Sequence, residues 1–136
     1  MIQAAEEEDE EHESLHEAHV RNAEQARIVT RAFLAEVGPI GGPDAEAVLL
    51  VASELVTNAV RHAGGVTRFR LVAGPGTVTV TVEDASATAP RRWRRTPDEP
   101  CGAGWRLVRQ LAEDVEVSTR PGGKSVSAVV PLPPET

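Results

Sequence analysis

The amino-acid sequence predicts an α+β fold in which about three helices cover one face of a mostly antiparallel, mixed sheet. Residues 22–37 and 44–63 repeat apolar side chains at helical spacing. Four later segments alternate apolar and polar residues, and they form two pairs joined by turns that contain Gly and Pro. Helices laid on one face of such a sheet bury both patterns, which gives a two-layer α/β sandwich.

The composition narrows the class of protein. The chain has 136 residues, enough for one domain with its own core, and no apolar run approaches the length that spans a bilayer. The single cysteine, Cys101, supplies neither a disulfide framework nor a set of thiolate metal ligands. The acidic N-terminus differs from a signal peptide, which begins basic and then becomes apolar. We therefore expect a cytoplasmic protein.

The net charge of −7 belongs to one short segment. Residues 6–13 hold seven acidic side chains and no basic ones, and without them the rest of the chain is formally neutral. We expect residues 1–13 to form a disordered acidic tail, either simply solvated or in contact with a basic partner, and residues 14–136 to form one domain. A neutral domain with four aromatic residues has neither the basic patch nor the stacking platform that nucleic acids require.

The first elements are a strand and a helix. The segment SLHEAHV, residues 14–20, is short, and we expect a strand there. Asn22 is suited to cap a helix that runs to about Val37, and Gly38 stands where a left-handed stop is expected. The glycine- and proline-rich residues 38–43 form a loop.

The second helix carries the most informative stretch, ASELVTNAVRHAGG at residues 52–65. We expect Asp44 to cap this helix, which ends at Gly64-Gly65. Its apolar residues fall on one broad face, and Glu54 and Asn58 lie one turn apart at the edge of that face. His62 follows one turn later.

Two strands and a turn come next. Residues 66–73 and 77–84 alternate with a period of two around the turn Gly74-Pro75-Gly76. The inward parity of the second strand continues onto Asp84 at its end. A carboxylate on the core side is costly unless it is paired or hydrogen-bonded, so Asp84 is a candidate ligand contact.

The remaining chain combines an irregular loop with one helix and a hairpin. Residues 85–101 show neither period, and loops of this length are often lids or binding loops. A helix of about residues 104–113 follows Gly102-Ala103-Gly104. Strands at about 114–119 and 125–132 then flank a turn, Arg120-Pro121-Gly122-Gly123.

In order along the chain these features resemble the ATP-binding domain of the GHKL superfamily, which includes histidine kinases, gyrase-type ATPases and Hsp90-like chaperones. They are a helix with Glu54-x-x-x-Asn58, a strand that ends in Asp84, and Gly102-x-Gly104 before a helix. Glu54 to His62, ELVTNAVRH, is most similar to the small bacterial anti-sigma factors that are serine kinases. The resemblance covers about residues 14 to 132 and implies the Bergerat-type ATP-binding fold.

The resemblance implies a role for each candidate residue. Asn58 would bind Mg²⁺ through its amide oxygen, and Glu54 would act as the base that orients or deprotonates an attacking hydroxyl. Asp84 would accept a hydrogen bond from the exocyclic amine of adenine. Four further residues would contact the nucleotide. They are Gly102 and Gly104 beside the phosphates, Ser125 near adenine, and His62 near the lid or phosphates.

Each residue also has an ordinary structural interpretation. In this interpretation Glu54 and Asn58 are solvent-facing helix residues, and Asp84 caps the next turn. His62 is then a polar residue at the end of its helix. Gly102-Ala103-Gly104 on its own is a common turn before a helix. The four arginines of residues 91–95 either are solvated or meet a triphosphate or an acidic partner.

The sequence departs from the family pattern at three places. The first glycine box, Asp-x-Gly-x-Gly, reads Asp84-Ala85-Ser86-Ala87-Thr88 and lacks both glycines. Trp105 stands where a leucine is usual, and the arginine-rich lid is short.

Two functions therefore remain open, together with a less favoured detached histidine-kinase domain. The first is an ATP-binding, Mg²⁺-dependent anti-sigma factor that sequesters a sigma factor, phosphorylates Ser or Thr of an antagonist protein, or does both, as a homodimer. The second is a protein-interaction module that has kept the fold with weak or no nucleotide binding.

Overall fold

The computed structural model describes residues 14–37, 42–86 and 102–133. Several expectations lie outside these residues: the acidic tail, the stop at Gly38, most of the loop of residues 38–43, and most of the loop of residues 85–101 with its four arginines. The elements, in chain order, are β1 (Ser14–Ala18), α2 (Ala23–Val37), α3 (Pro43–His62), β2 (Arg68–Gly74), β3 (Thr77–Asp84), α4 (Gly102–Leu111), β4 (Asp114–Arg120) and β5 (Gly123–Pro131).

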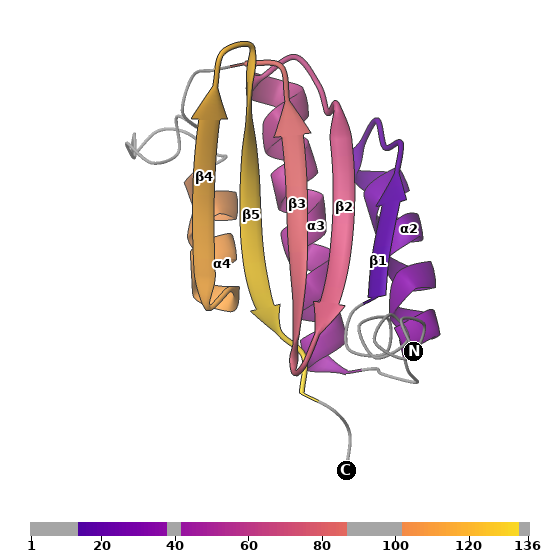
Figure 1. Cartoon of the computed structure of the whole chain (residues 1–136). Helices are drawn as coiled ribbons and strands as arrows, with labels where there is room; N and C mark the ends of the chain where they lie inside the picture. Colours follow the sequence, from indigo (N-terminus) through magenta and orange to yellow (C-terminus); the bar gives the residue numbers. More distant parts are fainter. Residues whose placement is uncertain (1–13, 38–41, 87–101, 134–136) are drawn as a thin grey trace, which may run out of the picture.

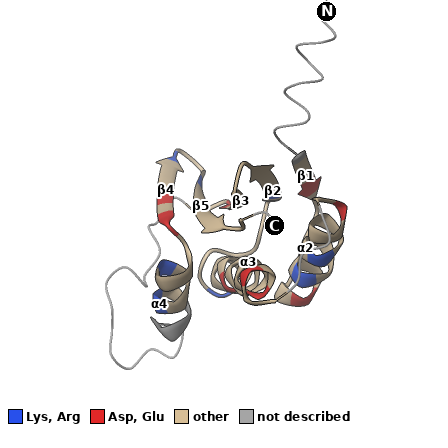
Figure 2. Ribbon diagram, turned by 90° about the horizontal axis from the view of Figure 1, so that it is seen from below, with Lys and Arg blue, Asp and Glu red and all other residues tan. Residues whose placement is uncertain are grey.

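The five strands form one sheet in the order β1-β2-β3-β5-β4, and each of the four pairs is antiparallel. Figure 2 shows the described helices side by side on one face of this sheet, with α3 between α2 and α4. The predicted two-layer α+β sandwich is confirmed, and its described pairs are antiparallel rather than mixed. The connection through α4 returns the chain to the end of the sheet where β3 began, so β4 runs parallel to β3 two places away and antiparallel to its neighbour β5.

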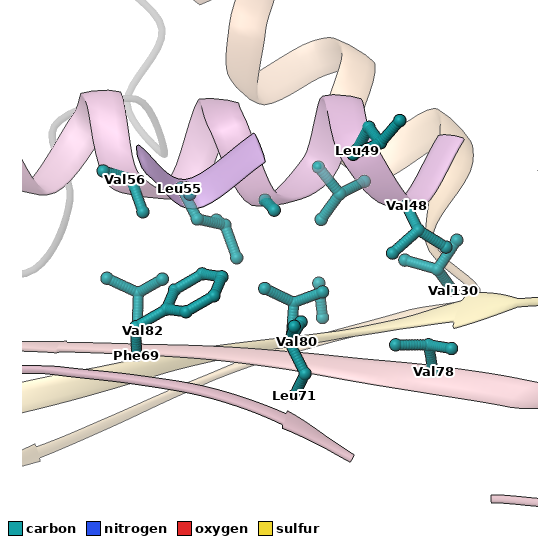
Figure 3. Close-up of a cluster of buried hydrophobic side chains, with 14 of the residues drawn as sticks. Val48, Leu49, Leu55, Val56, Phe69, Leu71, Val78, Val80, Val82 and Val130 are labelled. Carbon is teal, nitrogen blue, oxygen red and sulfur yellow. The ribbon is translucent and has the colours of Figure 1, made fainter. Parts of the chain in front are cut away.

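The core lies between the sheet and α3. Inward side chains of β2 and β3, among them Phe69, Leu71 and Val80, are fully buried beneath the apolar face of this helix (Figure 3). Burial alternates along all eight residues of β3, as its period-two sequence predicts. No helix in the described part of the chain covers the opposite face of the sheet, which we call the uncovered face (Figure 2).

The ends of the helices follow local chemistry. Asn22 caps α2 as predicted, because its Oδ1 accepts a hydrogen bond of 2.8 Å from the backbone N–H of Gln25. The prediction that Asp44 caps α3 is wrong. Gly42 is the N-cap, and Pro43 begins the helix because a proline needs no hydrogen-bond partner for its nitrogen at this position. At the other end Gly64, with φ of 80°, ends α3 where predicted.

None of the helices in the described part of the chain is long and apolar enough to cross a membrane.

Candidate functional site

The middle helix carries Glu54 and Asn58 on the flank that faces away from α2. The α2 flank is marked by Ser53, whose hydroxyl lies 3.2 Å from the guanidinium of Arg27. At about 100° per residue, Asn58 lies roughly 140° around the helix from Ser53. Figure 2 shows α4 beside α3 on the side opposite α2. Glu54 and Asn58 are both half-buried, so they border the core and still reach solvent.

The end of α3 lies close to the end of β3. The segment that follows the helix pairs with this strand, since the backbone N–H of Thr67 donates to the carbonyl of Glu83 over 2.7 Å. His62, the last residue of α3, is exposed at this end of the sandwich. The fold therefore brings the α3 residues and Asp84 to the same end of the molecule (Figure 1).

The carboxylate of Asp84 is buried and already paired. Asp84 as a whole residue is 2% exposed, as the inward parity of β3 predicts. Lys124 of β5 contacts both of its oxygens, at 3.1 Å from Oδ1 and 3.0 Å from Oδ2, and the lysine is 3% exposed. The backbone N–H of Ser86 also donates to Oδ1 over 2.9 Å, so Asp84 caps the following turn as well.

The sequence interpretation missed Lys124, although a signal for it was present. Val126, Ala128 and Val130 are buried on β5, and Lys124 shares their parity. Ser125 has the opposite parity. It pairs in register with Glu83, whose side chain joins Arg68 and Arg120 on the uncovered face of the sheet. Ser125 therefore lies across the sheet from Asp84, and the other candidate residues lie on the helix side.

The glycine pair lies at the start of α4. The helix begins at Gly102 and includes Gly104 in its first turn. Its far end leads to Glu113, whose backbone N–H donates to Val129 in the second half of β5. The first turn consequently points toward the end of the sheet that holds Asp84 (Figure 1). Trp105 is 5% exposed and packs within the hydrophobic core.

This arrangement fits Mg-ATP on the phosphate side. Asn58 offers a hard amide oxygen, and the start of α4 offers backbone N–H groups. The described residues hold no group of three or more His, Cys, Asp or Glu side chains for a metal ion, so magnesium would depend on Asn58 together with phosphate oxygens. On the base side, the acceptor oxygens of Asp84 are engaged by Lys124.

Gly123 allows β5 to approach the end of β3 closely beside this ion pair. A Cβ on Gly123 would lie 2.6 Å from the backbone carbonyl oxygen of Asp84. Because that atom is backbone, the end of β3 would have to move. We expect Gly123→Ala to lower the free energy of unfolding by about 1–3 kcal/mol in chemical denaturation.

The matched control for that substitution is Gly74→Ala, also at the end of a strand. There the added Cβ would meet only the Thr77 hydroxyl at 3.7 Å, an ordinary contact. We expect that change to stay within about 0.5 kcal/mol of the wild type. Equal losses in the two variants would show that the close approach at Gly123 does not constrain the fold.

Comparisons with known proteins agree with this architecture. Residues 16–130 match the family model of the histidine kinase-like ATPase domain. No curated protein matches the chain. The structure is similar to the RsbU and RsbW domains of Rv1364c from Mycobacterium tuberculosis, with a TM-score of 0.59 and 21% identity over 90% of this chain and 34% of that one.

It is also similar to the histidine kinase domain of the blue-light activated histidine kinase EL346 from Erythrobacter litoralis. That TM-score is 0.52, with 22% identity over 83% of this chain and 62% of the other. The chain thus spans less than two thirds of either neighbour, and identities this low compare folds alone. The family match covers most of the chain and confirms the GHKL resemblance. The chain belongs to the histidine kinase-like ATPase domain family.

Proposed function

We propose that this protein is a Mg-ATP-binding regulator of the anti-sigma type. In this function it phosphorylates a serine or threonine of an antagonist protein, sequesters a sigma factor, or does both, in the cytoplasm and as a homodimer. The observation that carries the proposal is the pair Glu54 and Asn58, half-buried one turn apart on α3 at the end of the sandwich that also holds Asp84. The ELVTNAVRH sequence and the RsbW domain in one structural neighbour support the anti-sigma branch.

The residues suit phosphoryl transfer because that reaction needs positioning and charge stabilisation more than covalent chemistry. Bound Mg-ATP would supply the γ-phosphoryl group and the charge of the metal. Asn58 would hold the metal through its amide oxygen. Glu54 would orient the attacking hydroxyl and take its proton, since an ionised carboxylate accepts hydrogen bonds only. The N–H groups at the start of α4 would face phosphate oxygens.

The first test is the binding of Mg-ATP to the full chain by calorimetry. We expect Asn58→Ala to weaken Mg-ATP binding by roughly ten- to a hundredfold, because a ligand of the metal is lost. When EDTA removes the magnesium, Asn58→Ala should bind ATP about as tightly as the wild type does. The matched control is Thr57→Ala, also half-buried on α3 and next in sequence, which should bind as the wild type does.

Equal Mg-ATP affinities for the Asn58 and Thr57 variants would contradict the role of Asn58. If the folded wild type and its variants gave no heat at all, the nucleotide site itself would be rejected.

A second candidate function is a protein-interaction module with weak or no nucleotide binding. The specific observation in its favour is the Asp84–Lys124 ion pair, which engages the carboxylate that would receive adenine. The missing glycines after Asp84 point in the same direction. The two candidates differ in one result: the regulator transfers labelled phosphate from ATP to an antagonist protein, and the module binds a protein partner without any transfer.

A further inference from the structure

Lys124 holds the position that a base amine would need at Asp84. Its ammonium lies 3.0 Å and 3.1 Å from the two carboxylate oxygens. Both side chains are nearly excluded from solvent, with exposures of 4% for the lysine and 3% for the aspartate. Two buried charges of opposite sign therefore satisfy one another, and their contact belongs to the helix-covered side of the sheet.

The strand register enforces this contact. Asp84 and Lys124 are directly opposite in the β3–β5 ladder, with Val82 opposite Val126 as the next inward pair. Directly opposite residues in an antiparallel pair have Cβ atoms about 4.5–5.5 Å apart, so a lysine easily reaches the carboxylate. Gly123, packed on the Asp84 carbonyl, brings β5 close to the end of β3.

An exocyclic amine is a weaker competitor for the same oxygens. Both donors would meet an ionised carboxylate, but the Lys124 ammonium adds the attraction between two full opposite charges, which the neutral amine lacks. Displacing the ammonium would also leave a positive charge without its partner in a buried position. Oδ1 already receives the Ser86 N–H in addition to Lys124, so little acceptor capacity remains there.

We propose that Lys124 is a residue that determines nucleotide affinity and base selectivity, acting as an internal competitor for Asp84. This inference rests on the proposed nucleotide site. The wild type then binds adenine nucleotides weakly and distinguishes poorly between ATP and a triphosphate whose base lacks the amine. Removal of the ammonium exposes the carboxylate to the base, so both affinity and selectivity rise.

The experiment compares the binding of Mg-ATP and of the Mg²⁺ complex of purine riboside triphosphate to the full chain by calorimetry, in the wild type and in Lys124→Met. Unsubstituted purine carries a hydrogen where adenine carries the amine and has no N–H on the neighbouring ring nitrogen, so this edge of the base cannot donate to Asp84. We expect Lys124→Met to bind Mg-ATP about tenfold or more tightly than the wild type, with no gain for the purine riboside triphosphate. The gain should disappear in Asp84→Ala/Lys124→Met, which lacks the acceptor.

Two further variants keep the test decisive. Lys124→Gln takes the place of the methionine variant if that variant fails to fold. Glutamine retains a neutral donor for Asp84, so we expect a gain in Mg-ATP affinity that is smaller than the gain for methionine. Arg120→Met removes a cation at the same end of the sheet but on the uncovered face, where it pairs with Glu83 at 3.2 Å. It should give no gain for ATP.

The outcomes distinguish a failure of the role of Lys124 from a failure of the nucleotide site. Wild-type binding as tight as, or tighter than, that of folded Lys124 variants overturns the role of Lys124 and leaves the nucleotide site standing. A gain that purine riboside triphosphate shares equally also overturns it, because the amine would then play no part. Absence of binding in every folded variant rejects the nucleotide site itself, and with it the role of Lys124.

Discussion

Asp84→Ala is expected to lower the free energy of unfolding by about 3–5 kcal/mol, because it leaves the Lys124 ammonium buried without its carboxylate. A hydrogen bond and an ion-pair contact from Lys124 and a hydrogen bond from Ser86 end on this side chain, and a methyl group can replace none of them. Chemical denaturation of the full chain in the absence of nucleotide measures the loss. A loss of this size is a large fraction of the free energy of unfolding of an ordinary domain.

The neighbouring residue supplies the matched control. Glu83 is also a carboxylate on β3, and it pairs with Arg68 at 3.7 Å and Arg120 at 3.2 Å on the uncovered face. We expect Glu83→Ala to cost at most about 1 kcal/mol, since ion pairs in contact with solvent contribute little. The double variant Asp84→Ala/Lys124→Met removes both buried charges and should recover much of the loss.

A cost for Asp84→Ala no larger than that for Glu83→Ala would contradict the buried ion pair. A double variant as unstable as the single one would assign the loss to packing or to the Ser86 turn instead.

The fold was predictable because its patterns are local. The alternation in TVTVTVED fixes which side of β3 faces the core, and Asn22 fixes where α2 begins. The N-cap of α3 was missed by two residues, since Asp44 has a side chain suited to capping but the cap lies at Gly42. Proline at the first helical position decided the outcome, with Gly42 as the N-cap.

The candidate site was predictable in part for the same reason. Parity alone placed Asp84 on the core side and required that something satisfy its charge. The identity of that partner depends on the β3–β5 register, which joins residues 40 positions apart in the chain. Helical spacing brought Glu54 and Asn58 together, whereas a family motif directed attention to Ser125 although the buried parity of β5 favoured Lys124.

The two halves of the site therefore lead to different expectations for function. On α3 the residues that suit magnesium and a reacting hydroxyl are half-buried and border solvent. At the end of β3 the residue that suits adenine is engaged within the chain. Catalysis would then persist with a low affinity for ATP, so that kinase activity must be measured at saturating nucleotide.

Under those conditions we expect Glu54→Gln to lower the rate of phosphate transfer to the antagonist by about 10²- to 10⁴-fold, the usual contribution of a general base. Glutamine keeps the size of the side chain and an oxygen acceptor, but it cannot take up the proton of the attacking hydroxyl. Mg-ATP binding should remain close to the wild-type value, because the role assigned to Glu54 concerns the hydroxyl and not the nucleotide. Single-turnover transfer from γ-labelled ATP to a purified bacterial anti-sigma antagonist gives the rate, and calorimetry gives the affinity.

The control for this loss is Glu46→Gln, an exposed carboxylate in the first turn of the same helix. It removes one negative charge from α3 two turns before Glu54, so a general electrostatic effect would lower the transfer rate in both variants. The loss of a general base would lower the rate only in Glu54→Gln. An unchanged transfer rate in Glu54→Gln would remove Glu54 from the chemistry. A parallel loss of Mg-ATP affinity would assign it to nucleotide binding instead, because a base that acts only on the hydroxyl leaves the binding of the donor intact.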